Sequence, residues 1–572
     1  MQKGLTKLIT TSVLTAMLCS CGGGSSSGSI GSGTSGGSNP TPTPVPAAPP
    51  TATQAARFLG QATFGVTTPD INNVVANGYS GWIDAQFAVP QKLHRNYMDS
   101  ISATLPANTT LNQNQFFESF WQQAVTGDDQ LRQRVTYALS QIYVVSFQDS
   151  TVSNFPRGVA SYYDTLASNA FGNFRNLLEA VSLHPMMGIY LTSLRNQKES
   201  GTRVPDENYA REVMQLLTIG LVQLNQDGSP KISNGKAIES YTSADITGMA
   251  KVFTGWSWAG ADKTDTRFFG GTPDPDRDWK PMQSYPKFHS TSDKNFLGVT
   301  IPAQTAANPE ASLKIALDRL YNHENTGPFI GKQLIQRLVT SNPSPAYVSR
   351  VAAAFANNGQ GVRGDMKAVI KAVLLDTEAR TDLDGNNIIA GKLREPVVRL
   401  ANWMRSFGAK SASTRFLMSN LDDPLSALGQ TPMRSPSVFN FYRPGYVPPN
   451  TSIAALSLVA PEFQITGETS VVGYLNFMRD VIPNGTGSSR DVKADYTNLV
   501  ALADTPDKLL DQISLLLTAN QMSATLRNQI LTAVNSVAIP TNSTTNADAA
   551  RKNRVYLSIF LTMASPEYLT QK

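Results

Sequence analysis

The stretch that decides the fold class covers residues 128–145, with the sequence DDQLRQRVTYALSQIYVV. Its apolar residues recur every three or four positions, which places them on one face of a helix: Leu131, Val135, Ala138, Leu139 and Ile142. Stripes of this kind are the buried faces of core helices far more often than ligand sites. The stretch therefore predicts a core helix.

Similar stripes recur to the end of the chain. Residues 505–518 begin with Thr505 as the cap and Pro506 at the first helical position, and residues 546–563 have the same spacing of apolar residues. Residues 221–238 differ, because two Asx-Gly pairs interrupt an alternating pattern and indicate a β-hairpin or meander. The sequence predicts a mostly α, multi-helical globular domain with a small β-hairpin insertion.

The N-terminus has the pattern of an exported lipoprotein. Lys3 and Lys7 precede an apolar run too short to span a membrane, and Leu18-Cys19-Ser20-Cys21 resembles the bacterial lipobox. We predict a signal peptide over 1–20 and lipid on Cys21, which anchors the protein to a membrane of the cell envelope. Gly22 favours the outer membrane. An ordinary cleaved signal or an uncleaved anchor is the alternative.

A tether is predicted to follow the lipobox. Residues 22–38 are almost only Gly, Ser and Thr, and residues 39–50 are rich in proline, so neither stretch can bury a core. We assign 21–52 to the tether and 53–572 to the helical domain, with a possible internal boundary near 300–325.

Composition excludes several classes of site. The only cysteines are Cys19 and Cys21, which leaves no disulfide and no cysteine-based metal or haem site. The net charge of +5 comes without a dense Lys/Arg run, so we expect no nucleic acid partner. With four histidines and no cofactor motif, we predict no cofactor and no metal. The aspartates of 274–278 (DPDRD) could offer oxygen ligands, but they lack the glycine and glutamate of a calcium loop and favour a solvated acidic loop.

Polar residues gather between positions 184 and 294. Residues 206–220 are predicted to form a helix on which Asn208, Arg211 and Glu212 share a face, and a second helix starts at 241–245. A long Gly-, Pro- and aromatic-rich loop over 259–298 is expected to be functional or disordered. The candidate catalytic residues are His184, Arg211, Glu212, Asp245 and His289, and the candidate ligand-binding residues are Asn208, Trp256 and Lys294.

A structural explanation of the same residues stays open. Arg211 and Glu212 could form a buried ion pair that joins helices, and such pairs are common without function. In that case, loss of Arg211 should destabilise the fold strongly. His289, in a loop, is expected to contribute little packing.

At these residues the chain resembles the bacterial family known as domain of unknown function 1800. The similarity covers 53–572 in order and is carried by the following stretches: Ala56-Arg57-Phe58-Leu59, Ala62-Thr63-Phe64-Gly65, His184-Pro185, Glu207-Asn208-Tyr209-Ala210-Arg211-Glu212, Phe253-Thr254-Gly255-Trp256, Phe288-His289, Lys294-Asn295-Phe296-Leu297-Gly298, Lys332-Gln333-Leu334, Lys392, Glu395-Pro396-Val397, Gly429-Gln430, Pro436-Ser437-Val438 and Ser565-Pro566-Glu567-Tyr568.

The resemblance implies a mostly helical secreted or envelope protein and brings no established activity. It also implies a possible partner, because members commonly occur beside an exported family that resembles sulfatases and alkaline phosphatases. Two functions follow. The first is a non-catalytic binding or scaffold module for a partner protein or surface polymer. The alternative is an extracellular hydrolase or lyase that acts on a polymer through the His, Arg, Glu and Asp candidates.

Overall fold

Capping residues and prolines fix where the helices of this chain begin. Thr51 and Gln54 form a reciprocal capping box at the start of α1 (Ala52–Ala62), and Thr242 and Asp245 form another at the start of α10 (Ser243–Val252). Proline occupies the first turn of α21 (Pro506–Thr518), as its sequence predicts. The two capping boxes satisfy backbone N–H groups that a helix start leaves without partners, and the proline has no such N–H group to satisfy.

The computed structural model describes residues 48–272, 274–381 and 390–572. The predicted signal peptide, Cys21 and most of the tether lie outside the described residues. From Pro49 onward the chain forms one compact unit. Within the described part of the chain, no helix combines the length and apolarity that crossing a membrane requires.

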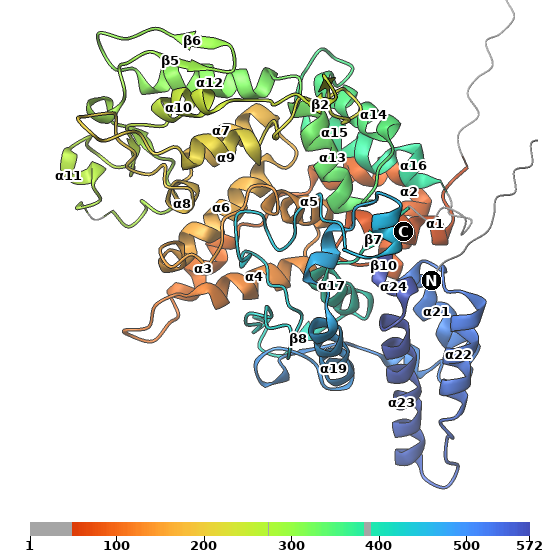
Figure 1. Cartoon of the computed structure of the whole chain (residues 1–572). Coiled ribbons are helices and arrows are strands. Elements are labelled where there is room, and N and C mark those ends of the chain that lie inside the picture. Colours follow the sequence, from red (N-terminus) through yellow and green to blue (C-terminus); the bar gives the residue numbers. More distant parts are fainter. Residues whose placement is uncertain (1–47, 273, 382–389) are drawn as a thin grey trace, which may run out of the picture. The chain divides into compact units, whose positions relative to one another are not determined.

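The fold class is confirmed as mostly α (Figure 1). The other long helices of the first half are α2 (Thr68–Ala88), α3 (His94–Ser102), α4 (Gln113–Thr126), α5 (Gln130–Ser140), α6 (Pro156–Asn169), α7 (Phe174–Leu183), α8 (Pro185–Tyr190) and α9 (Asn208–Gln215). Those of the second half are α12 (Pro309–Asn322), α13 (Thr326–Leu338), α14 (Pro345–Ala356), α15 (Met366–Leu375), α17 (Pro396–Ser406), α19 (Glu468–Asn484), α22 (Ala524–Asn535) and α23 (Thr544–Met563).

Short elements connect these helices. The single-turn helices are α11 (Asp265–Phe268), α16 (Thr377–Arg380), α18 (Ser452–Ala455), α20 (Thr497–Val500) and α24 (Pro566–Leu569). The 3-10 turns are η1 (Val152–Asn154), η2 (Pro286–Phe288), η3 (Pro461–Ile465) and η4 (Ser488–Arg490).

All of the strands in the described residues form two-stranded antiparallel pairs. The pairs are β1 (Ile232–Ser233) with β2 (Lys236–Ala237), β3 (Trp256–Ser257) with β4 (Gln283–Ser284), β5 (Lys294–Phe296) with β6 (Val299–Ile301), β7 (Lys392–Leu393) with β10 (Thr570–Gln571), and β8 (Lys410–Ser411) with β9 (Val492–Lys493). The first pair, extended by bridges at Val222 and Leu224, is the hairpin predicted for residues 221–238.

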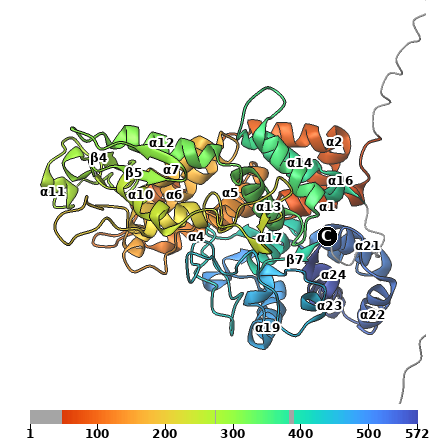
Figure 2. The same ribbon diagram turned by 45° about the horizontal axis from the view of Figure 1, so that its top comes forward.

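Helix α5 lies at the centre of the hydrophobic core. It packs against α1, α2, α4, α6 and α13 (Figure 2). All but one of its eleven residues are buried, so it is not the one-faced helix that its stripe predicts, and it ends at Ser140. Its polar side chains, Arg134 and Gln133 among them, must therefore find partners inside the protein.

Two other predictions are corrected. The helix predicted over 206–220 ends at Gln215, where the chain turns into the hairpin. The 259–298 stretch is built around a small aromatic core, because the rings of Phe268 and Phe288 stack with centroids 3.9 Å apart and Tyr285 packs on Phe268. This core explains why that stretch is held in place without long helices.

Candidate functional site

His184 caps a helix rather than facing solvent. It is buried, and its Nδ1 accepts a hydrogen bond of 3.2 Å from the backbone N–H of Met186 at the start of α8. Its ring packs edge-on against Tyr162. Burial lowers the pKa of His184 to about 3, so the ring is neutral at physiological pH.

The predicted ion pair between Arg211 and Glu212 is wrong. Arg211 pairs with Glu207 at 3.5 Å, and its side chain is 45% exposed. Glu212 is buried one position further along α9, where burial raises its pKa against the opposing effect of Arg211. Residues i and i+1 point in different directions on a helix, so loss of Arg211 should cost little. Asn208 is exposed on the same helix.

Asp245 holds the start of α10. Its carboxylate accepts hydrogen bonds from Thr242 and, at 2.6 Å, from the backbone N–H of Leu297 in the turn between β5 and β6. Burial opposes ionisation of Asp245, but these donors outweigh it and lower its pKa. The Asp245 carboxylate therefore connects α10 to the β5–β6 hairpin.

His289, expected to be a weakly packed loop residue, is fully buried. Its Nδ1 lies 2.8 Å from the carbonyl oxygen of Thr254 and its Nε2 lies 3.1 Å from the hydroxyl of Ser312 in α12. Burial lowers its pKa to about 4. Trp256 and Lys294 are also buried, the former in β3 and the latter in β5. The expectation of little packing at His289 is therefore wrong.

The candidates of the 184–294 region serve several separate helix starts and strand contacts. None of the eight candidate residues lines the pocket described below.

The acidic run 274–278 is held by neighbouring cations, with Lys280 3.3 Å from Asp276 and Arg267 3.7 Å from Asp274. Within residues 48–272, 274–381 and 390–572, no group of three or more His, Cys, Asp or Glu side chains is placed to hold a metal ion.

A pocket of about 390 Å³ lies elsewhere, between the end of α9, the hairpin after it, α13 and residues 438–445. Its walls are mainly apolar, and they include Ile142, Leu216, Ile219, Phe329 and Val438. The volume falls within the range of small-ligand sites. Two kinds of polar residue interrupt these walls: the glutamines Gln141, Gln215, Gln333 and Gln336, and the cations Lys332, Arg337 and Arg443.

The deep residues of the pocket carry polar atoms without partners. Gln141 Oε1, Gln333 Nε2 and Arg337 Nε are buried and make no hydrogen bond within the described residues. Each of the three side chains is more than nine-tenths buried. A buried polar group without a partner costs roughly 1–3 kcal/mol, and such groups are uncommon in folded proteins. These three atoms lie beneath the accessible surface of the pocket, where the described residues leave them without a hydrogen-bond partner.

A buried ion cluster lies behind these residues. Lys392 Nζ is 2.8 Å from Glu462 and 3.7 Å from Glu395, and the three side chains are at most 2% exposed. Glu395 also accepts hydrogen bonds from Tyr137 at 3.0 Å, Gln141 at 2.5 Å and Gln430 at 2.8 Å. Gln141 therefore connects the cluster to the pocket.

The two carboxyls of the cluster are shifted in opposite directions. Burial opposes ionisation of Glu395, but Lys392 and Arg134 outweigh it and lower its pKa. Burial raises the pKa of Glu462, and Lys392 offsets this only in part. Glu395 therefore carries the negative charge that Lys392 neutralises, while Glu462 retains a proton more readily.

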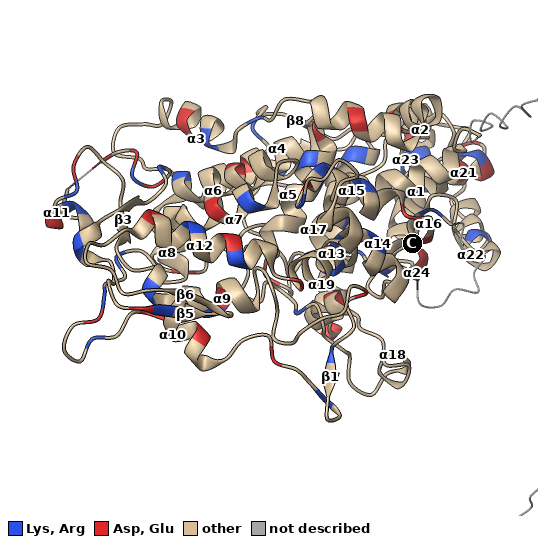
Figure 3. Cartoon of the chain, turned by 90° about the horizontal axis from the view of Figure 1, so that it is seen from above, with Lys and Arg blue, Asp and Glu red and all other residues tan. Residues whose placement is uncertain are grey.

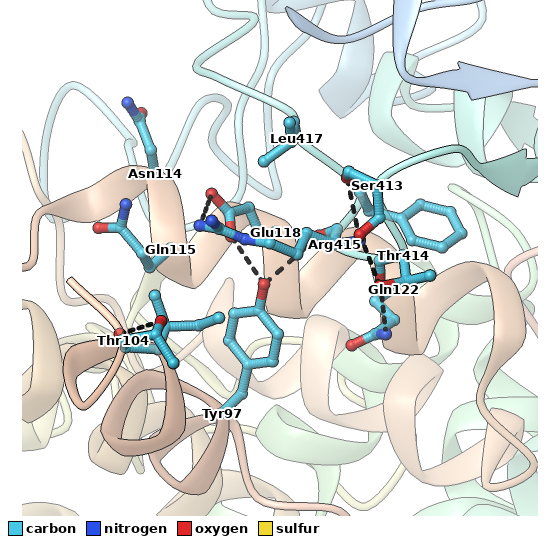
Figure 4. A network of polar contacts seen from close by, with 12 residues as sticks. Tyr97, Thr104, Asn114, Gln115, Glu118, Gln122, Ser413, Thr414, Arg415 and Leu417 are labelled. Carbon is cyan, nitrogen blue, oxygen red and sulfur yellow. Dashed lines mark hydrogen bonds and ion pairs between the residues drawn. The ribbon is translucent and has the colours of Figure 1, made fainter. Parts of the chain in front are cut away.

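A second buried carboxylate makes a useful comparison, because all of its contacts are internal. Glu118 in α4 accepts the hydroxyl of Tyr97 at 2.6 Å and the guanidinium of Arg415 at 2.8 Å (Figure 4). Neither of its carboxylate oxygens is left buried without a partner. This network joins α3 and α4 to the 413–417 segment and has the character of a structural contact.

Sequence reasoning named the motifs of this region without identifying them as a site. Gln333, Lys392, Glu395, Gln430 and Val438 all belong to stretches quoted for the family resemblance. They are separated by up to a hundred residues, so no helical or strand periodicity links them. One sequence signal could have identified the site. Several of these stretches place a charged or amide residue directly beside Pro or Gly in an otherwise apolar segment.

The buried histidines predict acid sensitivity. The unfolded chain protonates His184 below about pH 6.5, whereas the folded chain does not do so until about pH 3. Its stabilising contribution is therefore present above pH 6.5 and is lost as the pH falls. Between about pH 7.5 and 5, this linkage should remove about 2 kcal/mol of the free energy of unfolding.

Replacement by asparagine isolates this contribution, because asparagine also caps helices. The difference in unfolding free energy between wild type and His184→Asn, measured by urea denaturation, should shrink by about 2 kcal/mol from pH 7.5 to 5. An unchanged difference would mean that His184 titrates like a solvated histidine.

Comparison with known proteins comes to one result. The family model described as "Protein of unknown function (DUF1800)" matches residues 57–570. No curated protein and no solved structure matches the chain.

Proposed function

The chain belongs to the DUF1800 family of proteins of unknown function, and we propose that it is a non-catalytic binding module, held at the cell envelope by lipid on Cys21, that binds a partner protein. The pocket between α9 and α13 carries this proposal. Its described lining residues include no Asp, Glu, His, Ser, Thr or Cys, and so supply neither a carboxyl or imidazole acid–base group nor a hydroxyl or thiol nucleophile. They supply apolar area, amides and positive charge, which are means of recognition.

The hydrolase or lyase alternative loses its support. It requires His184, Arg211, Glu212, Asp245 and His289 to face one substrate. Three of them are engaged in separate contacts: His184 with α8, Asp245 with the β5–β6 turn and His289 with α12. Catalytic groups need mutual hydrogen-bond reach to act together.

The envelope part of the proposal rests on the N-terminal sequence. A positive n-region, a short apolar run and a lipobox-like Cys21 precede a Gly/Ser- and Pro-rich stretch suited to hold a domain away from a membrane. An exported protein resembling sulfatases or phosphatases is the partner that the family resemblance suggests.

Site-specific photo-crosslinking in cells tests the binding role. A photo-reactive benzoylphenylalanine at Leu221, which lines the pocket and is 59% exposed, should yield a discrete protein adduct. Val472 on α19 is the matched control, because it is 57% exposed and does not line the pocket. Equal labelling from both positions, or none from Leu221, would contradict the proposal.

The anchor is tested in the same cells. Cys21→Ser should move the protein from the membrane fraction to the soluble fraction, because the acyl chains that hold it are lost. Retention in the membrane fraction together with an unchanged protein mass would rule out lipid on Cys21.

A further inference from the structure

A strap of three polar residues, 570–572, lies across β7 and includes β10. Gln571 in the strap stands directly opposite Lys392 in the antiparallel pair of β10 and β7. Gly391 has a φ of +100°, and a methyl group added there would overlap the carbonyl oxygen of Gln571. The strap is therefore in direct contact with the backbone beside Lys392. Figures 1 and 3 both place this end of the chain next to α24.

Two side chains of this strand pair bind the same end of α13. Lys392 Nζ donates to the carbonyl oxygen of Arg337 at 3.0 Å, and Gln571 Nε2 donates to the next carbonyl, that of Leu338, at 2.7 Å. The last carbonyls of a helix have no partner within the helix, so both side chains cap α13. Directly opposite residues of a strand pair have neighbouring side chains, which places the Gln571 amide beside the Lys392 ammonium. Both residues are only 3% exposed, so the strap helps to keep water from the buried ion cluster.

The contacts that hold the strap itself are polar. None of its three residues carries an apolar side chain, and the apolar anchors end just before it, at the buried Tyr568 and the partly buried Leu569. The ring centroid of Tyr568 lies 4.4 Å from the guanidinium of Arg394, and its hydroxyl donates to the carbonyl oxygen of Arg399 at 3.0 Å. An isolated pair of strands is marginally stable in water, and segments with few buried apolar contacts open locally at low cost. The strap should therefore open more readily than the anchor at Tyr568.

We infer that the strap opens while the rest of the domain stays folded, and that this opening is the route by which water reaches the ion cluster of Lys392, Glu395 and Glu462. Opening removes Gln571 from the end of α13 and uncovers the Lys392 ammonium. Because α13 also forms one wall of the pocket, the strap sets how firmly that wall is held.

A reversible disulfide across the strand pair can lock the strap. The backbone N–H of Arg394 donates to the carbonyl oxygen of Leu569, directly opposite, at 2.7 Å. The next pair, Leu393 and Thr570, is therefore a non-hydrogen-bonded pair. The Cα atoms of such a pair are about 4.5 Å apart, a separation that a disulfide can span. Leu393→Cys/Thr570→Cys should thus form a bond under oxidising conditions that dithiothreitol removes.

The measurement is the rate at which an N-hydroxysuccinimide acetate acylates single lysines, followed by mass spectrometry. The protein is the full Cys19→Ser/Cys21→Ser chain, in which the two introduced cysteines are the only ones. Lys392 should react at least about tenfold more slowly in the oxidised form than in the reduced form. Lys294 is the matched control, because it is also buried and also donates to a backbone carbonyl, and its rate should be the same in both forms.

Gln571→Met loosens the strap without a disulfide. It removes the hydrogen bond to Leu338 and keeps the side-chain volume, so Lys392 should react roughly two- to tenfold faster while Lys294 is unchanged. Equal Lys392 rates in the oxidised and reduced forms, or in Gln571→Met and its parent, would overturn the inference, because water would then reach the cluster by another route. Slowing of both lysines by the disulfide would overturn it as well, since Lys392 would then be exposed by unfolding of the whole domain.

Discussion

Lys392→Met should lower the free energy of unfolding by about 3–5 kcal/mol. Lys392 is the only cation within ion-pair distance of Glu395 and Glu462 in the described part of the chain, and all three side chains are buried. Without it, the Glu395 carboxylate keeps only the more distant Arg134 as a counter-charge, in a medium that solvates ions poorly. The loss is a large share of a typical domain's stability, about 5–15 kcal/mol, so the variant should melt much earlier in a thermal scan.

A double-mutant cycle attributes the effect to the ion cluster. Glu395→Gln removes the carboxylate that Lys392 neutralises and keeps its shape, so Lys392→Met/Glu395→Gln should recover part of the loss. Lys314→Met is the control, because Lys314 forms an exposed pair with Asp318 and should change stability by less than about 0.5 kcal/mol. A Lys392→Met variant as stable as Lys314→Met would show that the cluster contributes no net charge compensation.

Gly248→Ala should destabilise the fold by about 3 kcal/mol or more, although alanine is the better helix former. Gly248 lies in α10 where the helix crosses β5, and an added methyl group would overlap the backbone carbonyl of Asn295. Backbone cannot rotate away as a side chain can, so α10 or the β5–β6 hairpin must shift. The Asp245 contact to Leu297 should weaken with it, which hydrogen exchange of the Leu297 amide would detect.

Gly60→Ala is the matched control within the same chain. Gly60 lies in the last turn of α1, and nothing lies within 4 Å of the position that a methyl group would take. Gain in helix propensity alone should then stabilise the protein by up to about 1 kcal/mol. Equal effects of the two substitutions would contradict the close approach of α10 to β5.

The sequence predicted those parts of the fold that depend on local spacing. The helices α21 and α23 follow from a proline or an apolar stripe, and the 221–238 hairpin follows from two Asx-Gly turns. Their hydrogen bonds are made between residues close in the chain, so a short window contains the relevant information. Whether a single polar side chain is exposed or buried depends instead on segments that are distant in the sequence.

The candidate site was predicted poorly because the burial of its side chains depends on such distant segments. His289 follows a short 3-10 turn and resembles a loop residue, yet α12 covers it from more than twenty positions away. Arg211 and Glu212 are adjacent in sequence, so their opposite exposures follow from how α9 packs. The pocket is lined by the residues directly after α5, by α9, by α13 and by the 438–445 segment, and only the tertiary structure brings those residues together.

The hydrogen bonds of Glu395 bear on the order in which the protein folds. Tyr137 on the central helix α5 and Gln141 directly after it donate hydrogen bonds to this carboxylate across 258 and 254 positions of the chain. During synthesis, Tyr137 and Gln141 therefore remain without this partner until a residue 258 and 254 positions later, respectively, has been made. Contacts so distant in sequence slow folding, because a long loop must close before they stabilise anything. We therefore expect the core around α5 to close only after Glu395 has been synthesised.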